Sequence, residues 1–123
     1  MNKILSTLIF AGLSFCLLTS CSGKKEELPV PPVNCDTTNV RYSTTILAIM
    51  NEHCYRCHTP ATNVGGPNLG TYTELALQAS NGNLLSSVNH EEGHPPMPMN
   101  AGKLNDCDLT RIRIWVESGF PDN

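Results

Sequence analysis

The stretch CYRCH at residues 54–58 determines how the rest of this chain is interpreted. It places two thiols three residues apart and an imidazole directly after the second thiol, so two reactive sulfurs and a metal-binding nitrogen share one short segment. The segment begins where a helical pattern ends. Within residues 44–54, Leu47, Met50 and Cys54 fall at i, i+3 and i+7 on one apolar face. We therefore expect the thiols and the imidazole to lie at the C-terminal end of a helix.

The C-x-x-C-H spacing predicts the attachment site of one c-type haem. Two thiols at this spacing can each form a thioether with one vinyl group of the same porphyrin, which assigns Cys54 and Cys57 to covalent attachment. His58 is then expected to be the proximal ligand of the iron.

Three alternative interpretations use the same residues. Cys54 and Cys57 could be a thioredoxin-like redox pair, although the preceding segment has the pattern of a helix rather than of a strand. They could instead form a structural disulfide with each other. They could also supply half of a zinc site, completed by two histidines drawn from His53, His58, His90 and His94.

Helical patterns dominate the remainder of the domain, which predicts an all-α fold of three to four short helices. A helix is expected at residues 72–79, with one further turn at residues 84–88. The strongest pattern follows Asp106, the expected N-cap, and ends before Gly119. No stretch alternates in the manner of a strand. The segments 59–69 and 91–102 are rich in Gly and Pro, and loops of this length predict that the domain wraps around a bound group.

The second of these loops contains the candidates for a sixth ligand of the iron. It reads HPPMPM at residues 94–99, and its prolines stiffen the backbone around two thioethers and one imidazole. The candidates are therefore Met97, Met99 and His94. Met50, by contrast, lies on the apolar stripe of the first helix and is expected to fill the core.

The order of these elements resembles a known family, the small monohaem class I-type cytochrome c domains, and in particular their planctomycete-type variant. The resemblance covers residues 39–123. It rests on the C-x-x-C-H motif, the Gly-rich loop, the Met-Pro loop and the ending WVESGFP at residues 115–121. It implies a fold wrapped around one covalent haem, held by Cys54 and Cys57 with His58 as the proximal ligand.

The resemblance also ranks the distal ligands and implies a role for the Gly-rich loop. The family has a Pro directly after its distal Met and a Leu seven residues further on, found here as Pro98 and Leu104. This pattern ranks Met97 first, Met99 second and His94 third. In the family, the backbone of the loop that corresponds to Gly65, Gly66 and Pro67 lies against the porphyrin edge, an approach that glycine permits. Phe120 stands where the family often has alanine, a departure that does not touch the ligands.

The N-terminal region has the pattern of a lipoprotein signal peptide over residues 1–20. A basic start at Lys3 precedes an apolar stretch that is shorter than a transmembrane helix requires. The sequence LTSC at residues 18–21 resembles the lipobox of bacterial lipoproteins, which predicts acylation of Cys21 and anchoring to a membrane without a span. Residues 21–34 are expected to form a charged, proline-rich tether, and residues 35–123 to form the haem domain.

Two cysteines of the domain remain after these assignments, Cys35 and Cys107. An even remainder in an exported domain predicts a disulfide, because free thiols are disfavoured outside the cytoplasm. This bridge would join the start of the domain to the beginning of its last helix.

Composition and charge exclude several functional classes. Eight Lys and Arg against eleven Asp and Glu give a net charge of -3, and the basic residues are scattered, which argues against nucleic-acid binding. Outside residues 90–94 no acid–base constellation is evident, so neither an enzyme nor a small-molecule substrate is expected.

Together these features predict an extracytoplasmic electron-transfer protein that exchanges electrons with redox partner proteins. We expect it to be held by its lipid anchor on the outer membrane or the cell surface, facing the periplasm or the exterior. The alternative is a structural or sensor lipoprotein that binds haem or zinc through Cys54, Cys57 and histidines.

Overall fold

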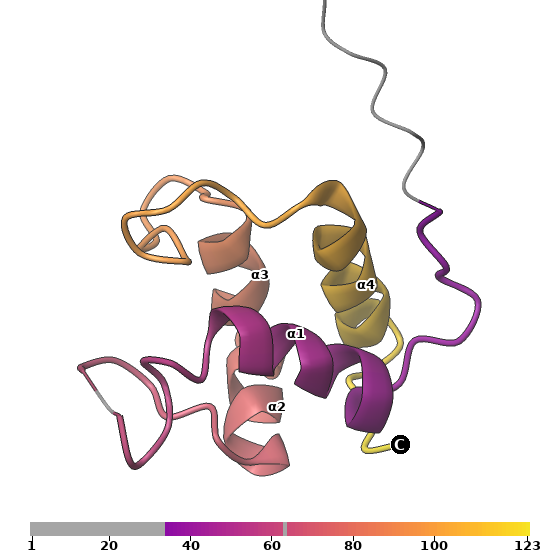
Figure 1. Ribbon diagram of the computed structural model, residues 1–123, viewed down its shortest axis with the longest axis horizontal. Coiled ribbons are helices and arrows are strands. Elements are labelled where there is room, and N and C mark those ends of the chain that lie inside the picture. Colours follow the sequence, from indigo (N-terminus) through magenta and orange to yellow (C-terminus); the bar gives the residue numbers. More distant parts are fainter. Residues whose placement is uncertain (1–33, 63) are drawn as a thin grey trace, which may run out of the picture. The chain divides into compact units, whose positions relative to one another are not determined.

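Short helices build the part of the chain that the computed structural model describes, residues 34–62 and 64–123, which belongs to one compact unit, Pro32–Asn123 (Figure 1). The helices are η1 (Tyr42–Ile46, a π-helical turn), α1 (Leu47–His53), α2 (Tyr72–Ser80), α3 (Asn83–Val88) and α4 (Asp106–Glu117). These described residues contain no strand, so the predicted all-α class is confirmed for them. None of the helices found there is long and apolar enough to cross a membrane. The predicted signal peptide, Cys21 and all of the tether except its last residue lie outside the described residues.

The first helix starts two residues earlier than the sequence pattern indicated. It runs without a break from Tyr42 through η1 into α1, and its first turn is wide because Ile46 N–H donates to the Arg41 carbonyl at 3.0 Å. The side chain of the N-cap residue, Arg41, makes no capping hydrogen bond. Instead, Asn123 accepts from the Tyr42 N–H through its Oδ1 and from the Ser43 N–H through its carbonyl, each at 2.8 Å. The apolar pattern alone could not reveal a cap supplied from so distant a residue.

Local capping explains where α2 and α4 begin. The Thr71 hydroxyl accepts from the Glu74 N–H at 3.3 Å and donates to the Glu74 carboxylate at 2.9 Å. At α4 the N-cap is Asn105, whose side chain accepts from the Asp108 N–H at 2.9 Å. The prediction of Asp106 as the N-cap is therefore wrong by one position, since Asp106 is already the first helical residue.

The end of α4 follows the predicted pattern. Gly119 has a left-handed backbone, with φ of 86°, and its N–H donates to the Val116 carbonyl at 3.0 Å. The Phe120 N–H reaches back to the Trp115 carbonyl at 2.9 Å. This pair of hydrogen bonds is a Schellman motif, which turns the chain away from the helix and over Trp115.

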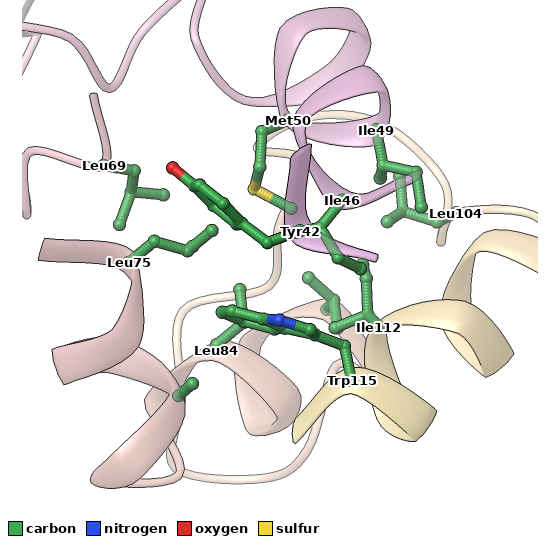
Figure 2. Packing of buried hydrophobic residues seen from close by; sticks show 12 residues of the cluster. Tyr42, Ile46, Ile49, Met50, Leu69, Leu75, Leu84, Leu104, Ile112 and Trp115 are labelled. Atoms are coloured by element: carbon green, nitrogen blue, oxygen red, sulfur yellow. The ribbon is translucent and has the colours of Figure 1, made fainter. Parts of the chain in front are cut away.

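The hydrophobic core brings the first and last helices together around Trp115 (Figure 2). The Trp115 indole is fully buried and stacks on Tyr42 with ring centroids 6.0 Å apart, while Tyr42 also meets Tyr72 edge-on at 5.2 Å. Met50 is fully buried, as its position on the apolar stripe predicted. The buried cluster comprises Tyr42, Ile46, Ile49, Met50, Leu69, Leu75, Ala79, Leu84, Val88, Leu104, Ile112 and Trp115.

A disulfide joins Cys35 to Cys107, the pair that the cysteine count predicted. It links the start of the domain to the first turn of α4 across a sequence separation of 72 residues. The Arg111 guanidinium donates to the Asp36 carbonyl at 3.2 Å beside it. The segment before η1 is therefore attached to α4 by a covalent bond and a hydrogen bond.

Removal of this disulfide should reduce the stability of the domain. We expect the double variant Cys35→Ser/Cys107→Ser to lose roughly 4 kcal/mol of unfolding free energy, because the unfolded chain regains the freedom of a long loop. Urea unfolding followed by the fluorescence of Trp115, the single tryptophan, measures the change. Reducing agent should shift the wild-type midpoint to that of the variant and leave the variant unchanged. Equal midpoints without reductant would contradict the prediction.

Candidate cofactor site

The residues of the C-x-x-C-H motif form tight turns directly after α1. The N–H groups of Cys54 and Tyr55 both donate to the Met50 carbonyl at 2.8 Å, and those of Cys57 and His58 both donate to the Cys54 carbonyl at 3.0 Å. These bonds continue the helix end as compact turns, which keeps the thiols and the imidazole on one short, ordered segment. Cys54 is half-buried, Cys57 is exposed, and both thiols are free. The pair is therefore available for a covalent bond to another molecule.

The His58 ring is held in one orientation and one tautomer. It is buried, and its Nδ1 lies 2.9 Å from the Pro67 carbonyl oxygen. Because a carbonyl only accepts hydrogen bonds, Nδ1 carries the proton and Nε2 presents its lone pair. No hydrogen bond joins Nε2 to any residue that the structure describes. An oriented imidazole with a free Nε2 is the arrangement that metal-ligating histidines adopt.

The Gly-rich loop packs directly against this imidazole. Gly66 has a φ of 88°, and a Cβ built on it would lie 3.3 Å from His58 Cε1. The Leu69 N–H donates to the His58 carbonyl at 2.8 Å and fastens the loop to the motif. The resemblance predicted that the backbone of Gly66 and Pro67 approaches the porphyrin edge. It did not predict their contacts with His58. A backbone carbonyl acceptor has no side-chain signature, so no sequence signal could have identified the Pro67 interaction.

Burial controls the chemistry of the two side chains at the start of the motif. Desolvation raises the pKa of the Cys54 thiol to about 11, which keeps it protonated at neutral pH. Desolvation also raises the pKa of Tyr55 to about 12. The interaction of its buried hydroxyl with the Tyr42 hydroxyl adds to this rise.

The second loop holds Met97 by its backbone. Its N–H donates to the Ser87 carbonyl at 3.0 Å, and its own carbonyl accepts from His90 Nε2 at 3.0 Å. Met97 is half-buried, whereas the Met99 side chain is 65% exposed. His94 is half-buried, with its N–H donating to the Glu91 carbonyl at 3.2 Å. Within the described residues, no hydrogen bond or ion pair joins this loop to residues 54–58.

The zinc site left open by the sequence is not assembled in the described residues. No three His, Cys, Asp or Glu side chains in residues 34–62 and 64–123 are grouped so that they could hold a metal ion. His53 lies instead near two carboxylates, 3.6 Å from Asp108 and 3.8 Å from Glu52, at distances longer than a hydrogen bond. His53 therefore lies between the end of α1 and the start of α4.

One open depression on the described surface lies away from the motif. It is lined by Asp36, Asn39, Thr44, Thr45, Ala48, Ile49, Glu52, Asp108 and Arg111. None of the predicted site residues belongs to it, so it has no part in the candidate site.

Family models, curated proteins and solved structures provide no match to this chain. The candidate site is therefore interpreted from its own geometry and chemistry.

The different burial of the two motif thiols predicts different reactivity. In protein with both thiols free, iodoacetamide should modify exposed Cys57 well before Cys54 at pH 8. Modification of Cys54 should accelerate as the pH rises towards about 11, where its thiolate forms. Peptide mass spectrometry measures both rates. In urea the two rates should become similar, and similar rates in the folded protein would contradict the prediction.

Proposed function

We propose that this chain is an extracytoplasmic, membrane-anchored electron-transfer protein with one c-type haem. The observation that carries the proposal is the hydrogen bond from His58 Nδ1 to the Pro67 carbonyl, immediately after two free thiols at C-x-x-C spacing. The thiols supply the covalent attachment, and the imidazole is already in the tautomer that binds iron. When bound, the haem supplies a one-electron couple between ferric and ferrous iron.

The residues around the motif fit such a group. Residue 66 lies next to the His58 ring, and because it is a glycine it has no side chain there. A Cβ at this position would crowd His58 Cε1. Cys54 is half-buried and packs against the hydrophobic core, so its surroundings are apolar, as a porphyrin edge requires.

Met97 is proposed as the second axial ligand, with Met99 and then His94 ranked behind it. The hydrogen bonds on both sides of the Met97 peptide support this order, because they fix its backbone, whereas Met99 is largely exposed. A thioether donor favours the reduced state of the iron relative to a second histidine. With both axial positions taken by side chains, we assign no catalytic residue and no small-molecule substrate to this site.

The remaining parts of the proposal concern location and partners. Residues 1–20 would direct export, and lipid on Cys21 would anchor the protein through the tether to the outer membrane or cell surface. The partners would be redox proteins that meet the domain there. The net charge of the full chain, -3, favours partners with a positively charged docking face.

Covalent haem attachment is the decisive test of this function. Expressed with c-type haem maturation, the protein should show a sharp c-type band in the reduced-minus-oxidised spectrum of the membrane fraction. The haem should also remain bound through acid-acetone extraction. The variant Cys54→Ala/Cys57→Ala should lose this haem, whereas Cys35→Ser/Cys107→Ser should keep it. Wild-type protein that binds zinc, or only extractable haem, would support the structural or sensor lipoprotein instead.

The distal ligand is tested by two variants two positions apart. Ferric protein with methionine on the iron shows a weak long-wavelength absorption band. We expect Met97→Ala to abolish this band, because it removes the thioether that the loop fixes, and Met99→Ala to retain it. The reverse result would identify Met99 as the distal ligand. Loss in neither variant would exclude both as the required ligand.

A further inference from the structure

We infer that His90 is a positioning residue that holds the Met97 peptide in place and thereby selects Met97 over Met99 as the iron ligand. The inference rests on the proposed function for its ligand-selecting part. Its structural basis is the hydrogen bond from His90 Nε2 to the Met97 carbonyl, at 3.0 Å. Because the carbonyl is an acceptor, Nε2 carries the proton in this bond.

The Met97 peptide is held from both sides by the end of α3 and the residues after it. The Ser87 carbonyl accepts from the Met97 N–H at 3.0 Å and also from the His90 N–H at 3.2 Å. His90 and Met97 are therefore attached to the same carbonyl, and the His90 side chain closes the ring between them. These bonds close the loop at Met97 itself, so the Met97 backbone has a defined position relative to α3.

The backbone of His90 indicates that its side chain has a specific task. His90 adopts a left-handed conformation with φ of 54°, which is uncommon for residues other than glycine. Glycine would adopt this φ with less strain, but it could not donate to the Met97 carbonyl. A strained residue whose side chain bonds to a functional segment is an observation that favours a positioning role.

The hydrogen bonds that hold the Met97 peptide distinguish two methionines that are otherwise chemically equivalent. Met97 lies inside the closed ring and is half-buried, whereas Met99 lies beyond it and is 65% exposed. Only Pro98 stands between them. Without these hydrogen bonds, the loop would present two thioethers of equal donor strength to the iron. A small shift of the backbone would then replace Met97 by Met99 as the ligand.

The matched variants are His90→Gly and Asn100→Gly. Both positions are left-handed, with φ of 54° and 60°, so glycine relieves backbone strain at each. Only His90→Gly removes a hydrogen bond to Met97, since Asn100 makes none. The comparison therefore isolates the side-chain bond from the backbone effect. If His90→Gly folds poorly, His90→Asn replaces it in the comparison. Asparagine adopts a positive φ readily, but its side chain is too short to reach the position of the His90 Nε2.

The haem-loaded ferric variants should differ in two measurements. We expect His90→Gly to raise the affinity for added imidazole by roughly tenfold, the effect of losing one net hydrogen bond that holds the competing ligand. Its methionine band should weaken or persist through Met99. In the latter case the double variant His90→Gly/Met99→Leu should lose the band. Asn100→Gly should match the wild type in both measurements.

Two results overturn the inference. One is an imidazole affinity of His90→Gly equal to that of Asn100→Gly, together with an intact band in His90→Gly/Met99→Leu. The other is equal amide hydrogen exchange at Met97 in the two glycine variants, where we expect faster exchange in His90→Gly. Wild-type protein without covalent haem would instead refute the proposed function and the ligand selection. The exchange measurement would still decide whether His90 holds the Met97 peptide.

Discussion

The packing of the Trp115 indole is the interaction on which the arrangement of the helices depends. It stacks on Tyr42 at the start of the first helix, and its N–H donates to the Pro121 carbonyl at 3.0 Å. Phe120, brought back over the helix end by Gly119, meets it edge-on at 6.3 Å. A single buried ring thus joins the first helix to the last helix and to the C-terminal segment. The first helix is thereby held in place, and with it the motif at the helix end.

The candidate site is built outward from this packed centre by backbone groups more than by side chains. The Pro67 carbonyl orients His58, and the Ser87 carbonyl fixes Met97. Carbonyl acceptors are available at every residue, so such a site needs few special side chains, which suits a chain this small. In the proposed function, two thiols, one imidazole and one thioether would supply the chemistry, and the loops that carry them would set its geometry.

The helices and the disulfide were predictable from the sequence because their causes are local or countable. Apolar spacing indicated α2 and α4, and four cysteines in the domain with one C-x-x-C pair left Cys35 and Cys107 to bond. The earlier start of the first helix was not predictable, since its cap comes from Asn123. The same holds for the bond from His90 to Met97, because side-chain-to-backbone contacts in loops leave no periodic pattern.

The disulfide has a consequence for the order of events during synthesis. Cys35, Cys54 and Cys57 all leave the ribosome before Cys107, which is the correct partner of Cys35. Among the cysteines within residues 34–123, those nearest to Cys35 along the chain during that interval are Cys54 and Cys57. Correct pairing therefore depends on α4 docking against the first helix and not on proximity in the chain. A substitution that disrupts the Trp115 contacts would therefore leave Cys54 and Cys57 open to pairing with Cys35.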